Sequence, residues 1–91
     1  IRLTKSFRKS FKRIINSGQE IGIKDEMTNI LDIIAKKQNL PKKYKDHALT
    51  GKYKTYRECH LKPDLLFVYK INVKESIIYA VNIGSHSDIF S

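Results

Sequence analysis

The sequence is poor in cysteine, in proline and glycine, and in long apolar runs. Its single cysteine, Cys59, excludes a disulfide within the chain and is typical of the reducing cytoplasm, where we expect this protein to act. No apolar run approaches the ~18 residues that a membrane span needs, and the basic N-terminal segment lacks the apolar core of a signal peptide. These absences exclude a disulfide-rich secreted scaffold and a membrane-spanning protein.

Acidic residues are scarce relative to basic ones. The chain has eighteen lysines and arginines and nine aspartates and glutamates, which gives a formal net charge of +9 at pH 7. Such an excess favours a polyanionic partner, whether nucleic acid, an anionic membrane surface or an acidic protein. A chain of 91 residues, 41% of them hydrophobic, is long enough for one small core, so we treat residues 1–91 as a single domain and exclude a multidomain enzyme.

Two amphipathic helices are predicted in the N-terminal half. The first carries apolar residues at positions 7, 11, 14 and 15, between a cap at Thr4 or Ser6 and a stop at residues 16–18. The second begins near residue 25, carries its apolar stripe over residues 27–35, and has lysines 36 and 37 in its last turn before Pro41. The basic face of the first helix is either a solvated exterior or a contact for RNA or protein, and it comprises Lys5, Arg8, Lys9, Lys12 and Arg13.

Three strands are predicted in the C-terminal half, at residues 55–61, 65–71 and 77–83. The middle segment is apolar on both faces and is therefore the central strand of an antiparallel meander. Residues 41–54 are predicted as a polar loop, and residues 1–3 suit a brief edge strand. The predicted fold class is α+β, with two N-terminal helices packed on one face of a small, mainly antiparallel sheet.

Antiparallel pairing brings three ionisable residues to one end of this sheet. The last strand returns beside the preceding hairpin turn, so His86 arrives close to Asp64, and His60 lies just before the same turn. With symmetric hairpins, His60, Leu66 and Asn82 lie opposite one another on one face. A slip of one residue would change the face of Asn82, whereas the clustering at this end would remain.

Two histidines and a carboxylate in a strongly basic protein can cleave RNA by acid–base chemistry. One imidazole can be neutral and another charged near pH 7, and cations stabilise the extra charge on the phosphate. Each residue also has a structural interpretation: a half-buried hydrogen-bonded ring for His60, a turn residue for Asp64 and a helix cap for His86. A zinc site is disfavoured because Cys59 points to the opposite strand face from His60 and no metal-ligand spacing is present, so we expect no metal and no cofactor.

Three blocks of sequence resemble the YafQ branch of the RelE/ParE toxin superfamily, namely Tyr44–Gly51, Tyr56–Asp64 and Gly84–Phe90. Their order and separations also match, although the N-terminal half agrees in layout rather than in motif. The resemblance implies a small microbial-ribonuclease-type fold and the toxin of a type II toxin–antitoxin pair. Such toxins cleave mRNA, usually on the ribosome, and leave a 2′,3′-cyclic phosphate and a 5′-hydroxyl.

The resemblance also implies roles for individual residues. His86 matches the general acid on the leaving 5′-oxygen, and His60 and Asp64 match the pair that activates or orients the 2′-hydroxyl, with the base unassigned between them. His47 matches a loop histidine implicated in activity, and Phe90 a C-terminal aromatic of the site.

One expected phosphate-binding residue differs from the family. Relatives often carry an arginine where this chain has Asn82, so another cation must hold the phosphate or the chemistry is slower or more dependent on the ribosome. The candidates for substrate binding are Lys52, Lys54, Arg57, Lys62 and Asn82.

The resemblance further implies partners: a cognate antitoxin protein, mRNA with ribosomal RNA, and operator DNA reached only through the antitoxin complex, but no membrane. An alternative function is a non-catalytic one, either a ParE-like inhibitor of a topoisomerase or a basic RNA-binding module, because a fold does not fix function. The histidine set favours the nuclease, since a pure binding protein does not need it.

Overall fold

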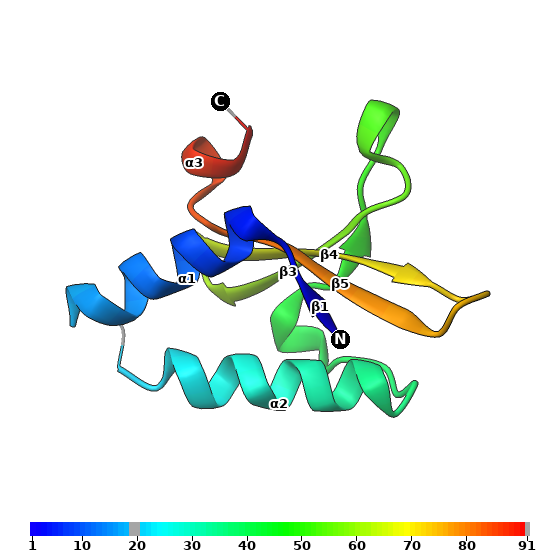
Figure 1. The fold of residues 1–91 in the computed structure, drawn as a ribbon, viewed down its shortest axis with the longest axis horizontal. Coiled ribbons are helices and arrows are strands. Elements are labelled where there is room, and N and C mark those ends of the chain that lie inside the picture. Colours follow the sequence, from blue (N-terminus) through cyan, green and yellow to red (C-terminus); the bar gives the residue numbers. More distant parts are fainter. Residues whose placement is uncertain (19–20, 91) are drawn as a thin grey trace.

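The computed structural model describes residues 1–18 and 21–90 and has an α+β fold (Figure 1). Within these described residues, three helices and five strands follow one another, with two single-turn helices, η1 and η2, before β3. Their bounds are β1 Arg2–Leu3, α1 Lys5–Ser17, α2 Ile23–Ala35, η1 Lys42–Tyr44, β2 His47–Ala48, η2 Gly51–Tyr53, β3 Arg57–Lys62, β4 Leu65–Asn72, β5 Ile77–Gly84 and α3 His86–Phe90.

The ends of α1 follow the prediction. Thr4 is the N-cap, and its hydroxyl oxygen accepts a hydrogen bond from the Phe7 N–H at 3.1 Å. Gly18 closes the helix in the left-handed conformation, with φ at 70°, which glycine adopts without steric cost.

The end of α2 was predicted too far along the chain. The helix stops at Ala35, so Lys36 and Lys37 lie beyond its last turn. Lys37 has a positive φ of 58°, which is incompatible with continuing a right-handed helix.

Over the part of the chain that the structure describes, the sheet has five strands in the order β1–β5–β4–β3–β2. The predicted meander of β3, β4 and β5 forms its centre, and β1 adds the expected edge strand, parallel to β5. The interpretation of residues 41–54 as one polar loop was wrong, because β2 pairs antiparallel with β3 and the single-turn helices η1 and η2 flank it. A two-residue strand is too short to leave a period-two signal in the sequence.

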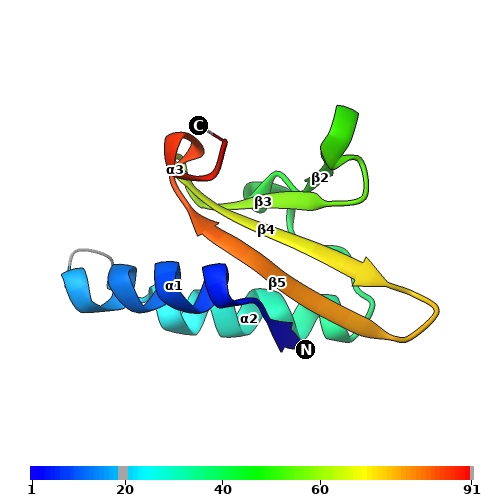
Figure 2. The same ribbon diagram turned by 45° about the horizontal axis from the view of Figure 1, so that its top comes forward.

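Both long helices cover the same side of the sheet, as predicted (Figure 2). Phe7 from α1 and Ile30 from α2 belong to one buried cluster with Phe67 from the central strand. Ile15, placed in the apolar stripe of α1, is exposed. On the other side of β4, Leu66 and Val68 are buried as well, which agrees with a central strand that is apolar on both faces.

The register of the meander matches the prediction in the β3–β4 pair but not in the β4–β5 pair. His60 pairs with Leu66, but Leu66 pairs with Gly84, and Asn82 pairs with Val68. The prediction that Asn82 lies opposite Leu66 was therefore wrong by two residues. The β4–β5 turn contributes one residue to this shift and a bulge in β5 contributes the other, so Asn82 stays on the same side of the sheet as Leu66.

Among the described residues, no helix is both long enough and apolar enough to cross a membrane.

Candidate active site

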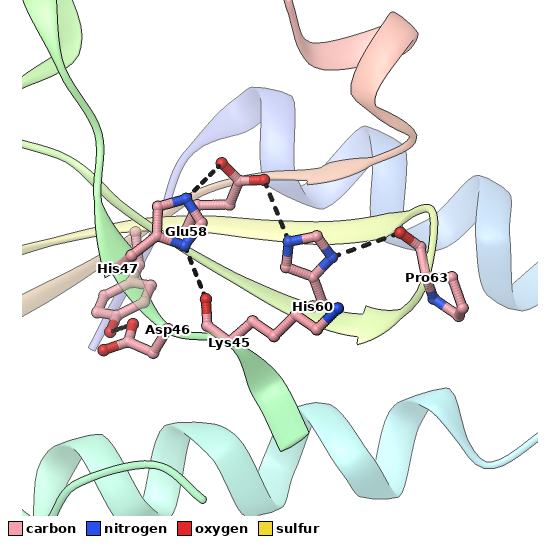
Figure 3. Close-up of polar contacts among 7 residues, drawn as sticks. Lys45, Asp46, His47, Glu58, His60 and Pro63 are labelled. Carbon is pink, nitrogen blue, oxygen red and sulfur yellow. Dashed lines mark hydrogen bonds and ion pairs between the residues drawn. The ribbon is translucent and has the colours of Figure 1, made fainter. Parts of the chain in front are cut away.

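A buried carboxylate, Glu58, lies between two imidazole rings (Figure 3). Its Oε2 is 3.5 Å from Nε2 of His47, and its Oε1 is 3.7 Å from Nε2 of His60. The Glu58 side chain is only 6% exposed, whereas His47 is 51% and His60 24% exposed. The carboxylate is thus buried beneath two more exposed rings, and we call these three side chains the histidine–glutamate group.

Backbone carbonyls orient both rings of the histidine–glutamate group. Nδ1 of His47 is 2.7 Å from the Lys45 carbonyl oxygen, and Nδ1 of His60 is 3.4 Å from that of Pro63. A carbonyl oxygen only accepts, so in each ring Nδ1 is the donor and Nε2 is turned toward Glu58.

Strand register explains how the histidine–glutamate group assembles. His47 pairs directly with Glu58 across β2 and β3, and His60 follows Glu58 by two residues on the same side of β3. Alternation along β3 puts Glu58 and His60 on one strand face. Glu58 is not among the predicted site residues, because nothing in the sequence indicates that β2 brings a second ring to the same carboxylate.

Asp64 and His86 come together at the end of the sheet, as expected. Oδ1 of Asp64 accepts a hydrogen bond from the backbone N–H of His86, at 3.1 Å, where α3 begins. Asp64 also directly follows Pro63, whose carbonyl receives the His60 ring, so the β3–β4 turn joins this pair to the histidine–glutamate group. Figure 2 shows α3 beside that turn.

An aromatic chain extends the site from α3. The His86 and Phe90 rings have centroids 5.0 Å apart, and Phe90 makes an edge contact with Tyr53 of η2 at 5.7 Å. Sequence reasoning missed Tyr53, although its position between Lys52 and Lys54 is the pattern of an aromatic residue among cations that a nucleic-acid site displays.

The predicted substrate-binding residues lie in different surroundings. Lys52, Lys54 and Lys62 are exposed, with the Lys52 ammonium 5.2 Å from the centre of the Tyr53 ring. The amide oxygen of Asn82 accepts a hydrogen bond from the Ser10 hydroxyl at 3.0 Å, which fixes that side chain against α1.

Arg57 is engaged elsewhere. Its guanidinium donates to Oδ2 of Asp46 at 2.8 Å, and this contact raises the pKa of Arg57. Arg57 alternates with Glu58 along β3 and so points to the opposite side of the sheet, where it lines a cavity of about 580 Å³ beside the C-terminal end of α2. Arg57 is therefore bonded to Asp46 on the side of the sheet away from the histidine–glutamate group.

Cys59 is a core residue rather than part of the site. It is fully buried on the helix-covered side, and desolvation raises the pKa of its thiol to about 12. Over residues 1–18 and 21–90, no three histidine, cysteine, aspartate or glutamate side chains are arranged to hold a metal ion.

Comparison with known proteins identifies the family to which this chain belongs. The model of a family described as the bacterial toxin of a type II toxin–antitoxin system, YafQ, matches residues 1–91. This chain belongs to the YafQ toxin family. The resemblance expected from the sequence is thereby confirmed, and the α+β architecture agrees with solved structures of YafQ toxins.

Individual relatives of this YafQ-family chain support the assignment. It is 39% identical over 51 residues to the mRNA interferase toxin YafQ of Escherichia coli K12, a segment that covers 56% of this chain and 53% of that protein. The chain thus spans about half the length of that curated relative. A crystal structure of a metal-bound toxin from Helicobacter pylori is 40% identical, covers 98% of this chain and 96% of its own, and has a TM-score of 0.88. The E. coli DinJ–YafQ complex, 24% identical with a TM-score of 0.82 and a coverage of 99% of this chain and 96% of the other, shares the fold.

Proposed function

We propose that this chain is an mRNA interferase, an endoribonuclease toxin that works without a metal or other cofactor. The observation that supports this proposal is the histidine–glutamate group next to the turn where Asp64 meets His86. The cleavage of RNA at a ribose requires a proton acceptor and a proton donor on opposite sides of one phosphate. The two parts of this site supply one each.

In the proposed reaction the ribose 2′-oxygen attacks the adjacent phosphorus while its proton passes to the histidine–glutamate group. The bond from phosphorus to the 5′-oxygen breaks, and the imidazolium of His86 protonates that oxygen. The products are a 2′,3′-cyclic phosphate and a 5′-hydroxyl. Because Glu58 contacts both rings, we assign the role of proton acceptor to the histidine–glutamate group without choosing one of its nitrogens. Phe90 holds the His86 ring in position and offers a face on which a base can stack.

In this proposal the substrate phosphates bind to Lys52, Lys54 and Lys62, whose side chains are exposed, and Asn82 contributes hydrogen bonding without charge. The substrate is mRNA, engaged on the ribosome in the cytoplasm. A cognate antitoxin, acidic enough to complement the net charge of +9, covers the toxin, and that complex rather than the toxin alone contacts operator DNA.

The test maps RNA ends after incubating the purified protein with mRNA in two reactions: one with programmed ribosomes in the Mg²⁺ buffer that they require, and one without ribosomes in the presence of a chelator. We expect cyclic phosphate ends at discrete positions, and their loss in His86→Ala. Ser87→Ala, the next residue of α3, is the matched control and should cleave like the wild type.

An absence of cleavage in both the ribosome-containing and the ribosome-free reactions would contradict the nuclease assignment and favour the non-catalytic alternative. Cleavage of ribosome-free RNA that requires an added divalent metal would contradict the proposed acid–base mechanism but not the nuclease activity.

A further inference from the structure

A second polar network lies behind the histidine–glutamate group, on the helix-covered side of the sheet. Oδ2 of Asp46 accepts two hydrogen bonds from Arg57, from Nη2 at 2.8 Å and from Nε at 3.3 Å. The other carboxylate oxygen accepts a hydrogen bond from the Tyr69 hydroxyl. These contacts connect the residue just before β2 to β3 and to β4. None of the three side chains takes part in the proposed cleavage step.

The two networks come from neighbouring residues of the same two segments. Asp46 precedes His47, Arg57 precedes Glu58, and His47 pairs directly with Glu58. Neighbouring residues of a strand point to opposite sides of the sheet, and Figure 3 shows the carboxylates of Asp46 and Glu58 on opposite sides. Because both networks share one backbone register, fixing Asp46 on the covered side also fixes His47 on the active side.

The backbone that carries His47 needs such a constraint. The strand β2 has two residues, both of them exposed, so its ladder supplies few hydrogen bonds. Lys45, two residues before β2, has a positive φ of 51°, a conformation that residues other than glycine adopt at a cost in free energy. The Lys45 carbonyl is also the acceptor that orients the His47 ring. Asp46 lies between Lys45 and His47, and its carboxylate accepts hydrogen bonds from side chains of β3 and β4.

We propose that Asp46 is a positioning residue for His47. Its bonds to Arg57 and Tyr69 hold residues 45–47 in the conformation that turns Nε2 of His47 toward Glu58. This inference rests on the proposed function, in which His47 belongs to the proton-accepting group.

The kinetic test is a double-mutant cycle with Asp46→Asn and His47→Ala on steady-state cleavage of mRNA. Asp46→Asn should lower kcat about tenfold to a hundredfold and change KM less than about threefold, because the ring that it positions acts in the chemical step. In the His47→Ala background the same substitution should lower kcat by less than about twofold, since no ring remains to be positioned. Asp32→Asn makes the same change in net charge on the exposed face of α2 and should leave kcat unchanged.

A purely structural role predicts a different pattern. Asp46→Asn would then lower kcat by the same factor with and without the His47 ring, and that result would overturn the inference. An unchanged kcat in the Asp46→Asn single variant would overturn it as well. If Asp46→Asn does not fold, Tyr69→Phe replaces it, because it removes one hydroxyl from the network, and the same cycle applies with a loss of about threefold.

A spectroscopic measurement separates this inference from the proposed function. In nitrogen-15 spectra of the histidine side chains, Asp46→Asn should shift the ring signals of His47 and leave those of His86 in place. Unshifted His47 signals would refute the positioning role whatever the activity. If the wild type does not cleave RNA, or if His47→Ala cleaves at the full rate, the proposed function fails, while the spectra still decide whether Asp46 positions the ring.

Discussion

Asp64 can either accept the proton of the 2′-hydroxyl or hold α3 in place, and two substitutions distinguish these roles. Asparagine keeps a side-chain oxygen that can accept the His86 N–H bond but has no basic carboxylate, whereas alanine removes both. In the structure the Asp64 carboxylate accepts that bond at 3.1 Å. We therefore predict that Asp64→Asn retains most of the activity and that Asp64→Ala loses more.

The magnitude follows from the contact. Removing the acceptor at the start of a short helix costs about 1–2 kcal/mol, so the ratio of correctly placed to displaced α3 falls about 5- to 30-fold in Asp64→Ala. A neutral amide oxygen forms a bond roughly half as strong as a carboxylate does, so the loss for Asp64→Asn is about two- to fivefold. If Asp64 were the proton acceptor, both variants would lose about 10²- to 10⁴-fold.

The assay is single-turnover cleavage of end-labelled mRNA at saturating toxin, with growth inhibition as a second readout. Ser85→Ala is a matched control, because the Ser85 hydroxyl accepts the Asp88 N–H bond in the same turn of α3 at 3.1 Å, and its loss should resemble that of Asp64→Ala. Equal and large losses in the asparagine and alanine variants of Asp64 would refute the assignment of this carboxylate to positioning.

Three further predictions concern the core, the thiol and the charge. Phe7→Ala should lower the free energy of unfolding in urea by about 3–5 kcal/mol, because the ring is 2% exposed and packs on Phe67; a loss below about 1 kcal/mol would contradict its place in the core. The free energy of unfolding should fall above about pH 9, by up to ~1.4 kcal/mol per pH unit, because the folded thiol of Cys59 keeps its proton up to a pKa of about 12 while the unfolded thiol loses it. Cys59→Ala should reduce this slope in denaturant titrations at increasing pH, and an unchanged slope would exclude the thiol as its source. Lys62→Ala should reduce the slope of log affinity against log salt for single-stranded RNA by about 0.7, and an unchanged slope would remove Lys62 from the phosphate contacts.

The meeting of Asp64 with His86 could be predicted from the sequence because hairpin topology alone places the end of β5 beside the β3–β4 turn. That prediction does not depend on the exact register, as Asn82 demonstrates. The predicted cross-strand partner of Asn82 was wrong by two residues. A bulge and the length of a turn depend on local backbone energies, which leave little trace in the pattern of side chains.

The role of Glu58 could not be predicted in the same way. Period-two alternation put it next to His60, but its second contact comes from His47, on a strand of two residues. Arg57 illustrates the same limit, because a basic residue beside the site is a reasonable phosphate ligand until Asp46 is found to hold its guanidinium.

The order of amphipathic helices and apolar strands by itself determined the α+β architecture and the end of the sheet where His86 and Asp64 meet. Few other arrangements of these helices and strands would bury the apolar surface on both faces of β4. Only the tertiary structure decided which carboxylate joins the two histidines and which cation is withdrawn from the site. Those contacts depend on a short edge strand and on individual hydrogen bonds, each worth about 1 kcal/mol, and such small energies become definite only when the whole sheet fixes the backbone.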